Sequence, residues 1–80
     1  METLIEDKLE TIYTSDLIFN VEYVGKGTEK VYKIFVMMRI GHQYDFEFKY
    51  KFDDYFTLDW NIQRIRKIID VNLLKTFVKF

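Results

Sequence analysis

The sequence predicts a small α+β domain with an N-terminal helix, a three-stranded antiparallel sheet and one or two C-terminal helices. Apolar residues follow a helical period near the start, alternate between residues 17 and 52, and return to a helical period after residue 57. Two short glycine-containing breaks divide the alternating region, so consecutive strands form hairpins in the order 1-2-3. The length of 80 residues predicts one domain, residues 1–80.

The first segment, Thr3 to Tyr13, has helical spacing. Thr3 and Glu6 have the form of a capping box, which satisfies free N–H groups where a helix begins. Residues 14–16 then end the period, because short polar side chains compete for backbone hydrogen bonds. The predicted apolar stripe consists of Leu4, Ile5, Leu9, Ile12 and Tyr13.

Three strands are predicted: one from Leu17, one over roughly Glu29–Ile40 and one over Tyr44–Phe52. Gly25–Thr28 forms the first turn, where glycine allows a positive φ, and Gly41–Gln43 forms the second.

The turn positions also predict the register of the sheet. A turn centred on Lys26-Gly27 would pair Val21 with Tyr32, and a three-residue second loop would pair Ile34 with Tyr50. The predicted buried face is Phe19, Val21, Tyr32, Ile34, Val36, Met38, Phe46, Phe48, Tyr50 and Phe52.

A second helix is expected to begin near Thr57 or Asp59, both suitable N-caps. The expected buried stripe of this helix is Leu58, Ile62, Ile65 and Ile69. For residues 71–80 we favour a further short helix after a break at Asp70–Asn72. A fourth strand, with Leu74, Thr76, Val78 and Phe80 alternating, stays open.

Composition excludes several classes of function. There is no cysteine, so disulfides, Cys-ligated zinc and thiol chemistry are excluded. No run reaches the roughly 18 apolar residues that a membrane span needs. The start of the chain is acidic where a signal peptide would be basic, so we expect a cytoplasmic protein. A net charge of -1 gives no global attraction to nucleic acid or anionic lipid.

Residues that could carry chemistry lack partners in the sequence. His42, the single histidine, stands in a predicted turn, and Ser15 lies in no nucleophile motif. Gly25–Thr28 differs from the phosphate-binding motif G-x-x-x-x-G-K-S/T in spacing, and it joins two strands where the motif joins a strand to a helix. We therefore expect no catalytic residue, no metal and no cofactor, and a protein that is not an enzyme.

The outer face of the sheet is the strongest candidate for binding. Ile18, Phe35 and Met37 interrupt an otherwise polar face, and the predicted register sets Ile18 beside Phe35 and Lys49. Coverage of this strip by the C-terminal segment, or a strip too small to matter, stays open. The predicted partner-binding residues are Ile18, Lys33, Phe35, Met37, Asp45, Glu47, Lys49, Asp53 and Asp54.

The order helix–strand–strand–strand–helix resembles the double-stranded RNA-binding domain. That family contacts RNA with a lysine-rich start of its second helix, where this chain has Asp59-Trp60-Asn61-Ile62. A second way to bind nucleic acid is stacking of bases on Phe35 of the sheet, which is flanked by Lys33, Lys49 and Lys51. Nucleic-acid binding is therefore the alternative function, and the net charge of -1 argues against it.

The function we favour is a small protein-interaction module. The element order is also similar to that of some small phage-encoded inhibitors, including certain anti-CRISPR proteins. Residues with AT-rich codons dominate, with 8 Phe and 6 Tyr against 3 Gly and 0 Pro, as in AT-rich phage genomes. This resemblance implies a larger host protein as the partner, blocked sterically. Unpaired sheet edges make a homodimer a further expectation.

Overall fold

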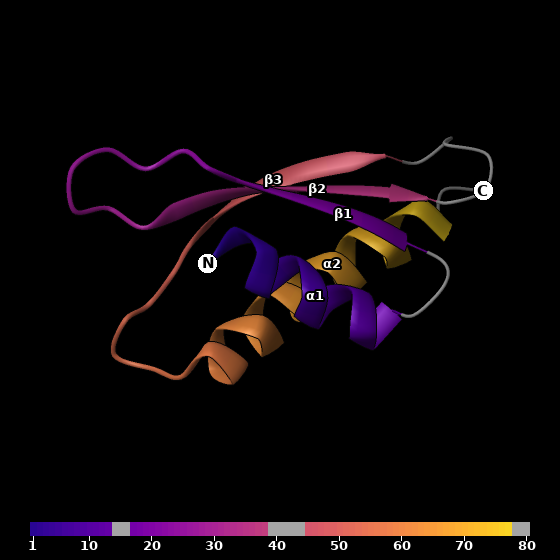
Figure 1. Ribbon diagram of the computed structural model, residues 1–80. Coiled ribbons are helices and arrows are strands. Elements are labelled where there is room, and N and C mark those ends of the chain that lie inside the picture. Colours follow the sequence, from indigo (N-terminus) through magenta and orange to yellow (C-terminus); the bar gives the residue numbers. More distant parts are fainter. Residues whose placement is uncertain (14–16, 39–44, 78–80) are drawn as a thin grey trace.

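The computed structural model describes residues 1–13, 17–38 and 45–77, without the side chains of residues 76 and 77. The chain folds as α1 (Glu2–Tyr13), β1 (Leu17–Tyr23), β2 (Val31–Met38), β3 (Phe46–Lys51) and α2 (Leu58–Phe77). The strands form one antiparallel sheet in the order β1-β2-β3, and both helices lie on the same face of it (Figure 1). The predicted α+β fold is confirmed.

Helix α1 begins at Glu2 rather than Thr3, and the predicted capping box is wrong. The Ile5 N–H donates to the Met1 carbonyl at 3.0 Å, so Thr3 already lies inside the helix. Glu6 reaches the sheet instead, where its Oε1 accepts from the Val21 N–H at 2.8 Å. Leu4 is 46% exposed, since the helix buries only the side that carries Ile5 and Leu9.

The inner face of the sheet is as predicted, but the register of both hairpins is shifted by two residues. Val21 pairs with Ile34 rather than Tyr32, and Ile34 pairs with Phe48 rather than Tyr50. In the first hairpin the cause is a wider loop over residues 25–30, closed by a 2.9 Å hydrogen bond from the Val24 N–H to the Val31 carbonyl. A two-residue shift keeps every side chain on its face, because the strand period is two.

Two glycines make this loop possible. Gly27 has a φ of 64°, in the left-handed region that glycine adopts without strain. Gly25 lies against the other side of the loop, and a Cβ atom there would overlap the Glu29 carbonyl. The second predicted turn, Gly41–Gln43, lies outside the described residues.

Helix α2 begins where the sequence predicts and continues further than expected. The Thr57 hydroxyl accepts from the Trp60 N–H at 3.1 Å, which identifies Thr57 as the N-cap. The helix then runs unbroken to Phe77. The predicted break at Asp70–Asn72 is therefore wrong. The alternative of a fourth strand from Leu74 is also wrong as far as Phe77. Asn72 fits inside the helix because its side-chain amide donates to the Ile68 carbonyl at 2.8 Å. Residues 78–80 lie outside the described part.

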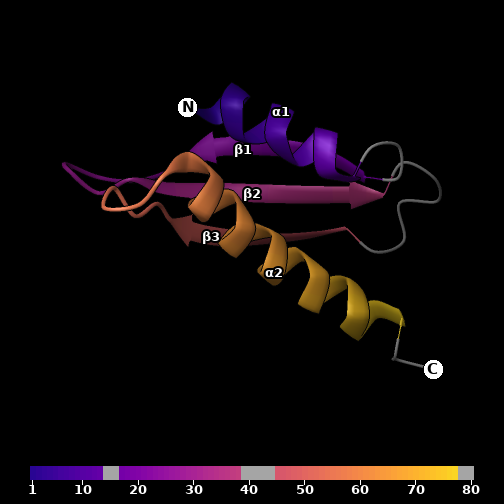
Figure 2. The same ribbon diagram turned by 90° about the horizontal axis from the view of Figure 1, so that it is seen from below.

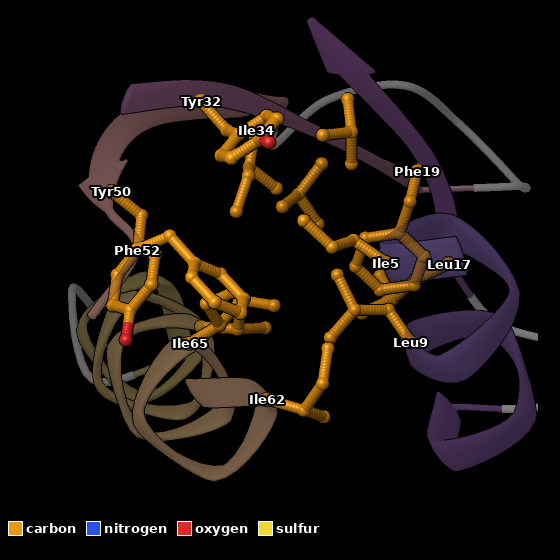
Figure 3. Close-up of a cluster of buried hydrophobic side chains, with 13 residues drawn as sticks. Ile5, Leu9, Leu17, Phe19, Tyr32, Ile34, Tyr50, Phe52, Ile62 and Ile65 are labelled. Atoms are coloured by element: carbon orange, nitrogen blue, oxygen red, sulfur yellow. The ribbon is translucent and has the colours of Figure 1, made fainter. Parts of the chain in front are cut away.

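The hydrophobic core lies between the sheet and the two helices (Figure 3). Met38, Phe46 and Phe48, predicted as core, are only partly buried, since they lie at the end of β2 and on the edge strand β3. The buried core residues are Ile5, Leu9, Leu17, Phe19, Val21, Tyr32, Ile34, Val36, Tyr50, Phe52, Ile62, Ile65 and Ile69.

One buried polar side chain, Asn61 of α2, ties β3 to the helix. Asn61 is 0% exposed, and its Oδ1 accepts from the Tyr50 hydroxyl at 2.7 Å and from the Asp53 N–H at 2.9 Å. Its Nδ2 donates to the carbonyls of Asp53 and Thr57 at 3.0 and 2.9 Å. Both donors and the acceptor oxygen are thus satisfied, as a buried amide requires.

Candidate protein-interaction surface

The outer face of the sheet is left uncovered by both helices (Figure 1). Because the register is shifted, Ile18 lies opposite Met37, and the predicted neighbours of Ile18, Phe35 and Lys49, are wrong. Phe35 lies between Asn20 of β1 and Glu47 of β3. The alternative in which the C-terminal segment covers this face is also wrong for α2, which runs on the inner face.

Ile18, Phe35 and Met37 form an apolar strip at the end of the sheet where β2 ends, and each is half-buried. Phe35 and Met37 line a shallow hollow of about 300 Å³ together with Asp45 and Glu47. The strip is thus bordered on the β3 side by two exposed carboxylates.

The charges around the strip are partly engaged within the molecule. Lys33 Nζ lies 3.1 Å from Glu47 Oε2 and 5.1 Å from the centre of the Phe35 ring. Asp45 Oδ1 accepts from the Met38 N–H at 3.3 Å. Lys49 lies directly opposite Lys33, so two like charges are neighbours across the strands.

The nine predicted residues do not form one continuous surface. Asp53 and Asp54 follow β3, whereas Asp45 precedes it, so they lie at opposite ends of the strand. Asp53 Oδ1 accepts from the Tyr55 N–H at 3.0 Å, as in an Asx turn. Asp54 Oδ1 lies 2.9 Å from Lys30 Nζ, and this hydrogen bond raises the pKa of Lys30. Both carboxylates organise the loop between β3 and α2.

Three tyrosines have raised pKa values, and burial is the main cause for each. Burial raises the pKa of Tyr32 and of Tyr50 because it disfavours the charged phenolate. For Tyr13, burial acts together with a 2.6 Å hydrogen bond that its hydroxyl donates to Asp70, and both raise its pKa. These phenols therefore stay protonated at neutral pH, and the hydroxyls of Tyr13 and Tyr50 donate hydrogen bonds to α2.

An aromatic cluster lies at the start of α2. Phe56 and Trp60 stack with ring centres 3.9 Å apart, and the Arg64 guanidinium lies 5.1 Å from the Trp60 ring. Trp60 is half-buried, and Tyr55, which precedes Phe56 in the chain, is 96% exposed. The i,i+4 spacing of Trp60 and Arg64 is the sequence signal for this contact.

Within the described ranges, no group of three His, Cys, Asp or Glu side chains could hold a metal ion, and no helix is long and apolar enough to cross a membrane. His42 and Ser15 lie outside those ranges. Comparisons of the chain with protein-family models, curated proteins and solved structures find no match.

Proposed function

We propose that this chain is a small, non-enzymatic protein-interaction module that binds a larger protein through the outer face of its sheet. One observation carries the proposal: both helices pack on the inner face, which leaves Ile18, Phe35 and Met37 as neighbours on the uncovered face. Contiguous apolar side chains with a polar rim are typical of protein-binding surfaces.

The chemistry of the strip indicates the partner that would fit it. Asp45 and Glu47 are exposed beside the hollow, so a complementary surface presents apolar side chains flanked by Lys or Arg. Asp53 and Asp54 are left out of this surface, since they follow β3 and lie at the opposite end of the strand from Asp45.

The biological setting we propose is inhibition of a host protein by a phage or mobile element. The AT-rich codon composition supports this setting. The mechanism would be steric: an 80-residue domain covers a functional groove of a larger protein in the host cytoplasm. Neither catalysis nor a cofactor is needed for such a block.

The test is capture of a partner from the lysate of an AT-rich bacterial host, followed by affinity measurements with the purified partner. Phe35→Asp and Met37→Lys are each expected to leave the fold intact, as judged by circular dichroism, and to weaken binding at least about a hundredfold. Leu74→Asp is the matched control, because Leu74 is 65% exposed on α2, away from the strip. Equal binding by Phe35→Asp and wild type would contradict the proposal.

Nucleic acid is the competing ligand in the same assay. Lys33 lies over the ring of Phe35 and pairs with Glu47, so both the ring face and the lysine charge are already engaged. This arrangement weighs against base stacking on Phe35. Binding that nuclease treatment and high salt abolish would favour nucleic acid over protein.

A further inference from the structure

β3 is an open edge of the sheet. The Phe52 N–H donates to the Lys30 carbonyl at 2.8 Å, so even-numbered residues here direct their backbone polar groups toward β2. In an antiparallel ladder the alternate residues point the other way. The N–H and C=O groups of Glu47, Lys49 and Lys51 therefore face away from the sheet, where an added strand would pair with them.

The opposite edge, β1, is closed at its centre. The outward N–H of Val21 donates to Glu6 Oε1 of α1, and α1 runs along this strand (Figure 2). A strand could not pair at Val21 without displacing the Glu6 side chain. Of the two edges, β3 is the one that can accept a partner strand.

Helix α2 offers a surface against which such a strand could pack. It crosses beneath β3 and continues past the open edge (Figure 2). Between them lies a hollow of about 370 Å³, with Trp60 and Ile68 of α2 among its lining residues. Both are half-buried, so they offer apolar surface to side chains that point inward from an added strand.

The charges at this groove are mainly positive: three cationic side chains and one carboxylate, that of Asp53, line it, and Asp53 Oδ1 accepts from the Tyr55 N–H. Lys49 and Lys51 of β3 and Arg64 of α2 line the hollow, and within residues 1–13, 17–38 and 45–77 none of the three makes a salt bridge. Trp60 and Arg64, two residue types that often dominate binding energy, also line the hollow. The complementary ligand is acidic.

We propose that the groove between β3 and α2 binds an extended acidic segment of a partner protein, which adds to the sheet as a fourth strand. The segment carries acidic residues at two alternate positions, facing Lys49 and Lys51, and an apolar residue between them that packs toward Trp60 and Ile68. This site is separate from the outer-face strip, and the inference does not rest on the proposed function.

A second copy of the chain is the competing occupant, because Asp45-Phe46-Glu47 has the same acidic–apolar–acidic pattern. If two β3 strands pair antiparallel about a two-fold axis, the inner faces of both copies lie on the same side of the shared sheet. Since α2 extends past the β3 edge, the two α2 helices would then be forced into the same layer beside the axis (Figure 2). A single extended peptide brings no helix and avoids this conflict.

The test uses the full chain and a short capped peptide of alternating Glu and Val, with binding followed by fluorescence anisotropy and amide exchange by NMR. We expect the amides of Glu47, Lys49 and Lys51 to become protected on binding, because they acquire carbonyl partners. Replacing Glu by Lys in the peptide is expected to abolish binding.

Protein variants separate this site from general charge attraction. The double variant Lys49→Glu, Lys51→Glu is expected to weaken binding roughly tenfold or more, since two attractive pairs become repulsive. The double variant Lys26→Glu, Lys67→Glu makes the same change of net charge at exposed positions outside the groove and is expected to bind within about twofold of wild type.

Peptide N-methylation separates strand addition from other modes of binding. Methylating the amides that would pair with β3 is expected to abolish binding, whereas methylating the alternate amides is expected to leave it unchanged. Equal effects of the two patterns, or no protection at Glu47, Lys49 and Lys51, would overturn the proposal. A dimer in light scattering that the Lys49→Glu, Lys51→Glu variant disrupts would also overturn it, by assigning the edge to a second copy.

Discussion

The two edges of the sheet differ in what lies beside them. At β1, α1 packs along the strand and Glu6 accepts the outward N–H of Val21. At β3, α2 lies beneath the strand and leaves the N–H groups of Lys49 and Lys51 unpaired by the sheet. Lysines on an edge discourage edge-to-edge aggregation, yet they leave the backbone able to pair with an acidic strand. The same lysines can thus protect a free edge from aggregation and make it selective for an acidic strand.

The largest expected effect is at the polar junction that holds β3 to α2. Asn61→Ala removes four hydrogen bonds and leaves buried groups of Tyr50 and Asp53 without their partner, so we expect a loss of about 2–4 kcal/mol in the free energy of unfolding. Urea denaturation measures it. Asn20→Ala, at an exposed position on the outer face, is the control and should change stability by less than about 0.5 kcal/mol. Similar values for the two variants would contradict the junction's role.

The next effect concerns the closed edge. Glu6→Ala removes the acceptor of the Val21 N–H, and we expect a loss of about 1–2 kcal/mol. The Val21 amide should exchange faster. Light scattering should also show concentration-dependent association, because β1 then has an unpaired outward N–H group at its centre. Glu6→Gln keeps a side-chain oxygen and should restore most of the protection. Unchanged exchange at Val21 in Glu6→Ala would show that α1 alone closes this edge.

A smaller effect is expected where α2 begins. Thr57→Ala leaves the Trp60 N–H without its cap and should cost about 1 kcal/mol in thermal or urea denaturation. Thr57→Ser keeps the hydroxyl and should recover that loss. Because Trp60, which the cap holds, lines the β3–α2 hollow, we expect faster amide exchange at Trp60 in Thr57→Ala than in Thr57→Ser.

The last effect appears only at alkaline pH and concerns two partly buried tyrosines, Tyr13 of α1 and Tyr50 of β3. Burial raises the pKa of Tyr13 and Tyr50 above the unfolded value of about 10. The folded state then holds these protons where the unfolded state has lost them, so stability is retained below pH ~10 and falls as pH rises above it. Tyr13→Phe and Tyr50→Phe should each flatten that decline. Tyr55→Phe, at a 96% exposed position, should leave it unchanged.

Local pattern alone was enough to predict the order of elements and the inner face of the sheet. The alternation in β3 and the stripe of Ile62, Ile65 and Ile69 each follow from the period of one element. Thr57 was also predictable as an N-cap, because a cap acts within one turn of its own helix. These features need no knowledge of neighbouring segments.

The tertiary structure decided the rest. The register depends on the length of each loop, and residues 25–30 form a wider loop than the two glycines alone indicate. Glu6 could be given a capping role from sequence because its true partner, Val21, becomes a neighbour only when α1 packs on the sheet. Asn61 lies outside the predicted apolar stripe of its helix, and its burial depends on the contacts that α2 makes with β3. Which face is uncovered and which edge is open depends on where the helices pack, and only long-range contacts determine that placement.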